Sequence, residues 1–193
     1  MRIITGHLRG REIPSHRALS SIRLTSSRLK EAVFSMLGSG LEDQIFLDLC
    51  AGSGQIGLEA CSRGAQVTFN EPDRRRYEQL RRLLRQLRAP RVDLHCAKGQ
   101  MLIPRLCESG KRFDLIYLDP PYHATRSDQP LSLALLELLA DGELLSPEGL
   151  LLIQHQSELE LPPSIGNLLL LQRRPYGNTA LAIYHLNPDP QPI

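Results

Sequence analysis

Four consecutive residues, Asp119-Pro120-Pro121-Tyr122, combine groups that suit one kind of chemistry. The exocyclic amine of a nucleobase is a poor nucleophile, because its lone pair is delocalised into the ring. The carboxylate of Asp119 and the carbonyl oxygen of Pro120 could accept its two hydrogens and stabilise the charge that develops during attack. Two prolines stiffen the turn, and the Tyr122 ring can stack on an extruded base. The motif predicts methyl transfer to a base amine, with these four residues as the catalytic site. The alternative is a strand that ends in a turn with a packed tyrosine.

A second motif, Gly52-Ser53-Gly54-Gln55-Ile56-Gly57, follows a predicted strand and precedes a predicted helix. Glycine lets the backbone turn sharply and approach a ligand closely, and Glu71, after the next strand, can accept hydrogen bonds from a ribose. A nicotinamide dinucleotide also fits this pattern. Asp48 favours S-adenosylmethionine, since a carboxylate can bind its amino group but is unfavourable beside a pyrophosphate; alternatively, Asp48 caps the turn. The residues predicted to bind the cofactor are Asp48, Ala51, Gly52, Ser53, Gly54, Glu71 and Pro72.

Basic residues are concentrated in two segments, although the net charge is only +2. Residues 1–30 hold seven basic residues against one acid, and residues 74–91 hold eight arginines against one acid. Arginine can grip a phosphate with two hydrogen bonds. Residues 1–24 include little that could build a core, so we predict an arm that grips RNA phosphates beside the target base. Residues 74–91 are equally consistent with a solvated helix face. The predicted RNA-binding residues are Arg2, Arg9, Arg11, Arg23 and Arg28.

Apolar runs that alternate with helical patterns must position these motifs. Their order predicts an α/β fold with a mostly parallel sheet, in which ligands bind beyond the carboxyl ends of the strands. A hairpin is expected around Gly6 to Gly10. The predicted strands are 45–50, 67–69, 92–96, 113–118, 150–153, 168–171 and 180–184, and the predicted helices are 25–37, one that ends near 63, 72–87 and 131–139.

The length of 193 residues suits one domain with a small appendage. We expect a basic hairpin arm at 1–24, a methyltransferase domain at 25–187 and a disordered tail at 188–193. No apolar run approaches the length of a membrane span, and the N-terminus lacks the long apolar stretch of a signal peptide, so a cytoplasmic protein is expected. The four cysteines are isolated in the sequence, which gives no reason to predict a metal site.

Beyond the two motifs, the chain resembles the bacterial 16S ribosomal RNA guanine-N2 methyltransferases that modify a single guanine. The resemblance runs nearly end to end. It covers the family's opening hairpin, its R-P-T-[ST]-x-R-[VL]-[RK]-E-[AT]-[LV]-F signature, its D-x-x-A-G-S-G-x-x-G-L-E-A-x-S-R run, its D-P-P-[YF] and its closing Y-G-[DN]-T-A. The matching segments are Arg2–Gly6 with Arg9–Arg11, Arg23–Phe34, Asp48–Arg63, Asp119–Tyr122 and Tyr176–Ala180.

The resemblance implies a Rossmann-like methyltransferase fold, with a seven-stranded, mostly parallel sheet and a small N-terminal β-hairpin extension. It implies S-adenosylmethionine as the cofactor and N2-methylation of one guanine in 16S rRNA as the reaction. The implied partner is rRNA within a 30S subunit or an assembly intermediate, and the implied enzyme is monomeric and does not bind membranes. The chain departs from the family at Leu24, where a proline is usual, at Cys96–Gly99, which lacks an aspartate, and at Gln154-His155, which replaces a frequent acid.

Two alternatives are compatible with the same motifs. An N6-adenine or other amino-methyltransferase acting on DNA or RNA uses the same chemistry, but such enzymes commonly carry a separate target-recognition domain, for which 193 residues leave little room. A catalytically inactive relative that only binds nucleic acid would keep the fold. The intact Asp48, Glu71 and Asp119–Tyr122 argue against that alternative.

Overall fold

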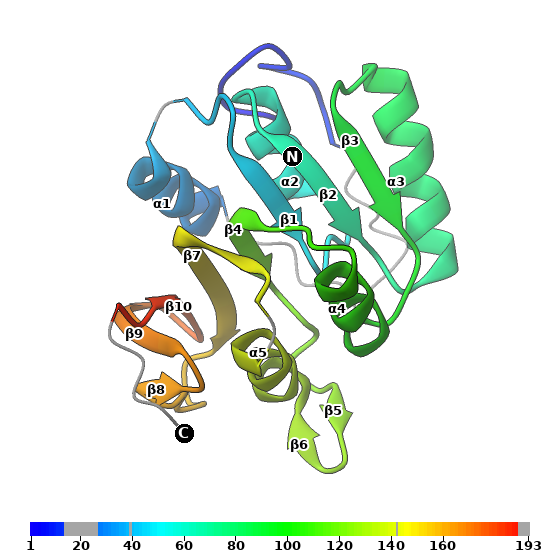
Figure 1. Ribbon diagram of the computed structural model, residues 1–193. Helices are drawn as coiled ribbons and strands as arrows, with labels where there is room; N and C mark the ends of the chain where they lie inside the picture. Colours follow the sequence, from blue (N-terminus) through cyan, green and yellow to red (C-terminus); the bar gives the residue numbers. More distant parts are fainter. Residues whose placement is uncertain (14–26, 39, 142, 189–193) are drawn as a thin grey trace. The chain divides into compact units, whose positions relative to one another are not determined.

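The computed structural model describes residues 1–13, 27–38, 40–141 and 143–188. The chain forms two compact units, Met1–Ala97 and Lys98–Ile193, whose elements are labelled in Figure 1. Arg23, Leu24 and the expected start of the first helix lie outside the described residues, as does most of the expected tail. The division into 1–24, 25–187 and 188–193 stays a prediction.

The first unit contains a parallel sheet in the order β3-β2-β1, formed by Val92–His95, Gln66–Asn70 and Ile45–Asp48. Helices connect the strands, as parallel pairing requires: α2 (Gln55–Ser62) follows β1 and α3 (Arg74–Leu87) follows β2. Helix α1 (Ser27–Leu37) precedes the sheet. Every residue of α2 is buried, including Glu59 and Ser62, so these polar side chains must find partners inside the unit.

The sequence of α3 contains the features that form and end an amphipathic helix. The side chain of Asp73 caps the N-terminus by accepting a hydrogen bond from the amide of Arg76 at 2.9 Å. Leu80, Leu83 and Leu84 are buried on one face. The helix ends at Arg88, whose backbone is left-handed with φ of 50°, a position that glycine usually occupies.

The second unit contains a mixed sheet in the order β4-β7-β10-β9-β8. Strands β4 (Phe113–Leu118) and β7 (Leu145–Gln156) are parallel. Strand β10 (Thr179–Leu186) runs antiparallel to β7 and to β9 (Leu168–Tyr176). The short β8 (Ser164–Ile165) extends this edge, and β5 (Thr125–Arg126) pairs with β6 (Gln129–Pro130) apart from the main sheet.

Two helices accompany that sheet, and the sequence analysis predicts only one of them. Helix α5 (Leu131–Asp141) confirms the expected helix at 131–139. Helix α4 (Gly99–Glu108) was not expected, and it contains Pro104 in its interior, where proline normally interrupts a helix. Tertiary packing overrides that preference: Leu102, Ile103 and Leu106 are buried, and a Cβ on Gly99 would lie 2.9 Å from Leu135 of α5.

The predicted fold class is confirmed. All seven expected strands are present in the described residues, together with the three two-residue strands β5, β6 and β8. The parallel pairs β1–β2, β2–β3 and β4–β7 make the fold α/β and Rossmann-like. Among the residues that the structure describes, no helix is long and apolar enough to cross a membrane.

Candidate active site and nucleic-acid interface

Glu71, at the carboxyl end of β2, anchors the glycine-rich loop that follows β1. Its carboxylate accepts a hydrogen bond from the amide of Gly52 at 2.8 Å and another from the amide of Asp73 at 2.9 Å. Burial raises the pKa of Glu71, and these two amides offset part of the rise. A carboxylate oxygen carries more than one acceptor site. Glu71 therefore ties down the loop and still has acceptor capacity for a ribose.

Asp48, the last residue of β1, is 2% exposed. Its Oδ2 accepts a hydrogen bond from the amide of Gly57 at 2.9 Å. Burial raises the pKa of Asp48 to about 7, although the hydrogen bond from Gly57 lowers it in part. The nearby Glu71 carboxylate raises this pKa further. A Cβ on Gly57 would lie 2.2 Å from the Phe69 ring and 2.9 Å from the Asp48 carboxylate. Gly57 therefore serves close packing around Asp48.

Gly52 and Gly54 have left-handed backbones, with φ of 54° and 79°, which glycine adopts at little cost. Space remains open where a Cβ of Gly52 would stand, whereas a Cβ on Gly54 would lie 2.5 Å from Leu80. The open room at Gly52, the carboxylate of Glu71 and the buried acid Asp48 together fit a nucleoside cofactor that carries a cationic amino group. Of the other predicted cofactor residues, Ala51 is buried, Ser53 is half-buried and Pro72 is exposed.

The Asp119–Tyr122 turn begins directly after β4 in the second unit. Asp119 is half-buried and Pro120 is buried. The carbonyl oxygen of Pro121 closes the turn by accepting a hydrogen bond from the amide of Ala124 at 3.0 Å. The turn therefore has a defined backbone at the carboxyl end of a parallel strand, which is where open α/β sheets bind their ligands.

The hydroxyl group of Tyr122 belongs to a chain of side-chain hydrogen bonds. It donates to Oγ1 of Thr179 at 3.1 Å and accepts from Nε2 of Gln154 at 3.4 Å. Oε1 of Gln154 in turn accepts from the hydroxyl group of Tyr117 at 2.8 Å. Tyr117, Gln154 and Thr179 are buried, so the far edge of the Tyr122 ring is held from inside the unit.

Gln154 and Thr179 were not among the predicted site residues. Two features of the sequence could have found them: Thr179 lies in the segment that resembles the closing motif, and Gln154 lies where the chain departs from the family pattern. The antiparallel register of β7 and β10 brings them together, pairing Thr179 with Gln156 and Leu181 with Gln154.

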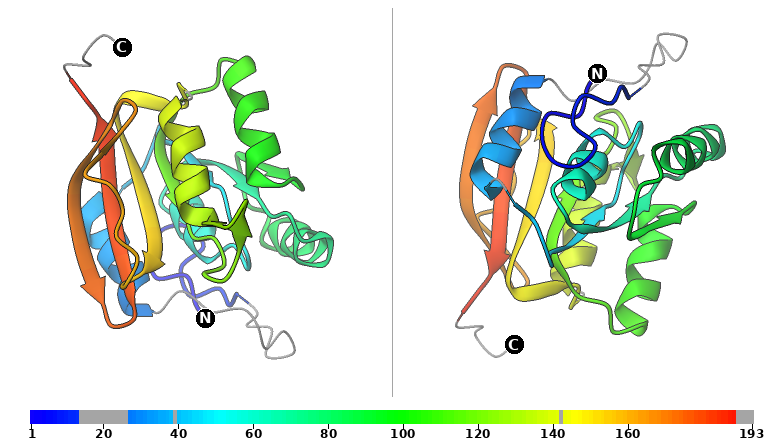
Figure 2. Two further views of the ribbon diagram at one scale, coloured as in Figure 1. Left: turned by 90° about the horizontal axis from the view of Figure 1, so that it is seen from below. Right: turned by 90° about the horizontal axis from the view of Figure 1, so that it is seen from above.

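The N-terminal residues form the expected hairpin, with an antiparallel bridge between Arg2 and Glu12. The hairpin lies on the C-terminal end of α2, the end away from the glycine-rich loop (Figure 2, right). The Glu59 carboxylate accepts hydrogen bonds from the amides of Ile4 at 2.8 Å and Thr5 at 3.0 Å. Oγ of Ser62 accepts from the amide of Leu8 at 2.9 Å. The hairpin is thus fixed to the first unit.

Three ionic side chains lie beneath the hairpin. Lys30 of α1 is 1% exposed, and its Nζ donates to the backbone carbonyl of Arg2 at 2.7 Å and to Glu59 at 3.3 Å. Arg63 donates to Glu59 at 3.2 Å and lies over the Phe34 ring, 4.6 Å from its centre. Buried charges are tolerated when they are paired and hydrogen-bonded. The family-like residues Lys30, Glu59 and Arg63 therefore have a structural task here.

The expectation that the N-terminal segment has little to build a core is wrong for residues 1–13. Ile3, Leu8 and Ile13 are all less than 7% exposed, because they pack into the first unit. Of the predicted RNA-binding residues, Arg9, Arg11 and Arg28 are exposed. Arg2 is also exposed and pairs with Glu12 at 3.0 Å. Their contact with RNA stays a prediction.

Comparison with known proteins finds relatives over nearly the whole chain. The family model described as Conserved hypothetical protein 95 matches residues 1–185. The Bacillus subtilis protein "Putative rRNA methyltransferase YlbH" is 32% identical over 186 residues, which cover 95% of this chain and 98% of that protein. "Ribosomal RNA small subunit methyltransferase D" of Haemophilus influenzae is 31% identical over 187 residues, covering 95% and 93%. The solved structure "Putative methyltransferase yhhF" of Escherichia coli has a TM-score of 0.81 at 28% identity, covering 98% of this chain and 99% of that one.

Proposed function

The chain belongs to the Conserved hypothetical protein 95 family, and on this premise we propose that it is an S-adenosylmethionine-dependent methyltransferase that modifies N2 of one guanine in 16S rRNA. The names of its relatives support an rRNA substrate. The observation that carries the proposal is the Asp119–Tyr122 turn at the carboxyl end of β4, with its aromatic ring anchored from within the unit.

The residues of the first unit suit the cofactor. Glu71 and the loop at Gly52 would hold the ribose, and the Asp48 carboxylate would pair with the amino group. When bound, S-adenosylmethionine supplies the methyl group, and its sulfur keeps the bonding electrons as the methyl passes to N2. Because Asp48 has a pKa of about 7, it can be ionised at neutral pH once a cation compensates its burial.

The residues of the second unit suit the amine. The carboxylate of Asp119 and the carbonyl oxygen of Pro120 would accept the two N2 hydrogens, which favours a pyramidal nitrogen and stabilises its developing charge. The methylated amine then gives up one proton, for which Asp119 is a suitable acceptor. The Tyr122 ring would stack on the extruded guanine, while its bond to Thr179 fixes the orientation of the ring.

We place the substrate within a 30S subunit or an assembly intermediate and the protein, as a monomer, in the cytoplasm. An exposed target base can be splayed out and stacked, which is how proteins commonly read single-stranded RNA. Arg9, Arg11 and Arg28 are exposed and available to phosphates, and Arg2 and Arg23 are assigned the same role.

Methyl transfer to 30S subunits from a strain lacking this gene tests the proposal. The purified protein is incubated with S-adenosylmethionine and subunits or naked 16S rRNA, and the nucleosides are identified by mass spectrometry. N2-methylguanosine is expected. Asp119→Ala should lower the single-turnover rate by about 10²–10³ while calorimetry shows unchanged binding of S-adenosylhomocysteine. Asp141→Ala, which removes an exposed carboxylate at the end of α5, is the matched control.

Other outcomes would assign the protein elsewhere. N6-methyladenosine as the product would replace guanine-N2 specificity with another amino-methyltransferase activity. Binding of S-adenosylhomocysteine without any methyl transfer to rRNA would indicate an inactive relative. A normal rate for Asp119→Ala would remove Asp119 from the reaction.

A further inference from the structure

Two basic segments that lie far apart in the sequence contact consecutive residues at the C-terminal end of α2. In the N-terminal hairpin, the amide of His7 donates to the carbonyl oxygen of Ser62 at 2.9 Å. In the turn between α3 and β3, the carbonyl oxygen of Pro90 accepts from Sγ of Cys61 at 3.5 Å. The hairpin and this turn, residues 88–91, therefore adjoin on one end of the first unit.

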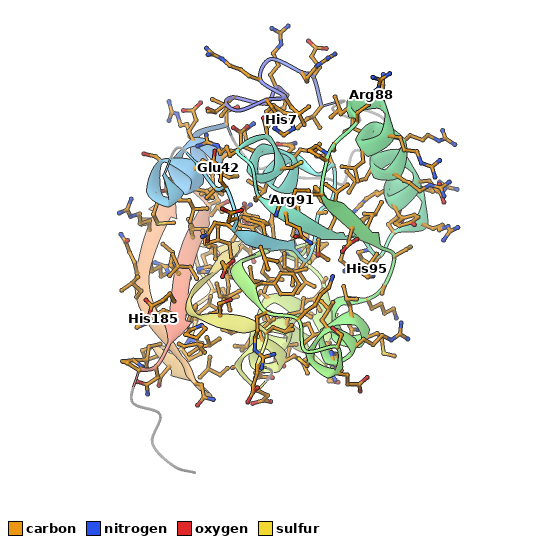
Figure 3. All side chains as sticks on the ribbon, turned by 45° about the horizontal axis from the view of Figure 1, so that its top comes forward. His7, Glu42, Arg88, Arg91, His95 and His185 are labelled. Atoms are coloured by element: carbon orange, nitrogen blue, oxygen red, sulfur yellow. The ribbon has the colours of Figure 1, made fainter. Side chains whose placement is uncertain are left out.

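Both segments carry exposed arginines at this end: Arg9 and Arg11 in the hairpin, and Arg88 and Arg91 in the turn. Figure 3 looks toward this end and labels His7, Arg88 and Arg91. Within the described part of the chain, ion pairs engage Arg2, Arg74 and Arg81, but none engages these four arginines. Several acids belong to the same unit: Glu12 pairs with Arg2, the buried Glu59 pairs with Lys30 and Arg63, and Glu42 and Asp93 are exposed.

The backbone of the turn adds a second observation. Arg88 has φ of 50° and Arg91 has φ of 52°, so both occupy the left-handed region, which costs a residue with a side chain about 1–2 kcal/mol. Glycine or asparagine would adopt it more cheaply. Nothing in the packing of the unit demands a guanidinium at either position, because both side chains are exposed. The exposed guanidinium groups of Arg88 and Arg91 can therefore serve contacts outside the fold.

We propose that Arg9, Arg11, Arg88 and Arg91 form one composite surface that binds the phosphate backbone of RNA. The identification of RNA as the partner rests on the proposed function. A guanidinium fork matches phosphate oxygens, and four exposed, unpaired cations from two rigid turns provide several such forks without the cost of ordering a flexible arm.

The position of this surface defines its role. The eight residues of α2 separate it from the glycine-rich loop, a length of about 12 Å at 1.5 Å per residue. Phosphate contacts at such a distance hold an RNA in register but do not select a base. The composite surface therefore binds the rRNA backbone away from the target base and is not part of the site that holds the base.

The double substitution Arg88→Gly/Arg91→Gly tests the surface, because glycine removes both charges and also relieves both left-handed positions. We expect a melting temperature that is not lowered. Filter binding across a salt series should show weaker binding of a 16S rRNA transcript. The slope of log K against log salt should become less steep by about 1–2. Arg88→Lys/Arg91→Lys keeps the charges and should keep the slope.

The matched control is Arg74→Ala/Arg75→Ala, which removes two charges from the opposite end of α3. Its slope should change less than that of the glycine variant. Equal slopes for the two variants would mean that only the diffuse positive field acts, and this would overturn the proposal, as would an unchanged slope for the glycine variant. If the wild-type protein shows the expected slopes but forms no N2-methylguanosine, the proposed reaction fails while the surface stands.

Discussion

The hydroxyl group of Tyr122 donates a hydrogen bond to Oγ1 of Thr179 at 3.1 Å, although the two lie 57 positions apart in the sequence. Gln154 extends this contact to Tyr117. Stacking on a base uses only the ring of a tyrosine, so the hydroxyl would be dispensable for that task. Its three-part anchorage indicates that the orientation of the ring is fixed before a base arrives, which lowers the entropic cost of capture.

Substitutions at these two residues should therefore be coupled. Tyr122→Ala should weaken base capture by roughly 1–3 kcal/mol, the usual contribution of one stacked base. Tyr122→Phe keeps the ring but loses the anchor, and Thr179→Val removes the same hydrogen bond from the other side. Each should raise KM for the 30S substrate more than it lowers kcat.

A double-mutant cycle measures this coupling. Because Tyr122→Phe and Thr179→Val break one shared bond, the double variant should cost clearly less than the sum of the two single variants. Binding of S-adenosylhomocysteine serves as the control and should stay unchanged. Additive effects on KM would show that the bond does not orient the ring.

The positions of the two motifs relative to the strands were easier to predict from the sequence than the contacts that support them. Asp119–Tyr122 and the glycine-rich loop are short segments at strand ends, so local pattern was sufficient to place them. The anchorage of Tyr122 depends on the register between β7 and β10, and no local pattern specifies a register. Gly57 matched the glycine pattern for a ligand, yet its Cβ space is filled by Phe69 and the Asp48 carboxylate.

For the fold, too, some elements could be predicted from local sequence and others could not. The seven longer strands followed from their apolar runs, but α4 was not predicted; it contains Pro104 in its interior, and its buried side chains and the close approach of Gly99 to Leu135 of α5 support it through packing. The hairpin was expected at residues 2–13, whereas its burial was not. Three apolar residues spaced five apart, Ile3, Leu8 and Ile13, follow neither a helical nor a strand period, so their shared contact with the first unit was hidden.

Gly52→Ala is the substitution that probes the cofactor loop most directly. A Cβ at Gly52 meets nothing within 4 Å, so the protein should fold with only the cost of a left-handed alanine, about 1–2 kcal/mol. The added methyl would occupy the room beside the ligand, and calorimetry should show weaker binding of S-adenosylhomocysteine. Gly54→Val is a poorer probe, because its Cβ would lie 2.5 Å from the buried Leu80 side chain and would change packing as well as cofactor binding.

Gly110→Ala is the control for this experiment. Gly110 has φ of 68° and also has open space at its Cβ, so the backbone strain is similar, but it follows the C-cap of α4 and has no predicted ligand. The Gly110→Ala variant should bind S-adenosylhomocysteine with the same affinity as the wild-type protein. If Gly52→Ala binds as tightly as Gly110→Ala, the loop at Gly52 does not contact the cofactor.

Asp48 should make both stability and cofactor binding depend on pH. Its pKa rises from 3.8 to about 7 in the folded protein, so the folded state favours the protonated acid. The stability that Asp48 contributes is fully present below about pH 4 and is lost as the pH rises through 7. Asp48→Asn should abolish this part of the pH dependence of the free energy of unfolding.

Cofactor binding should reverse the preference, because a cationic amino group pairs with the ionised acid. S-adenosylhomocysteine should therefore bind more tightly as the pH rises toward 7, by up to about tenfold per unit, and release a proton on binding below that pH. Calorimetry in buffers of different ionisation enthalpy counts the proton. Glu71→Gln, the matched control at the second buried acid, should bind more weakly yet still release it, whereas equal release by Asp48→Asn would assign the proton to another group.

The hairpin should behave as a fixed part of the first unit, and two glycines at its turn allow a matched test. Gly6 and Gly10 have nearly equal φ, 83° and 81°, so alanine strains the backbone equally at both. A Cβ at Gly10 meets nothing within 4 Å, but a Cβ at Gly6 would lie 1.6 Å from the carbonyl oxygen of Ser62. That oxygen belongs to the backbone of a fully buried helix and cannot move aside.

Gly10→Ala should therefore lower the free energy of unfolding by about 1–2 kcal/mol, and Gly6→Ala by clearly more. The excess arises because undocking leaves the Glu59 carboxylate without the amides of Ile4 and Thr5, and Lys30 without the carbonyl of Arg2. Buried polar groups that lose their hydrogen-bond partners lower the free energy of unfolding. Urea unfolding gives the free energies, and hydrogen exchange at the Ile4 and Thr5 amides reports undocking directly. Equal losses in the two variants, with both amides still protected, would show that the hairpin tolerates displacement from Ser62 and is not fixed by it.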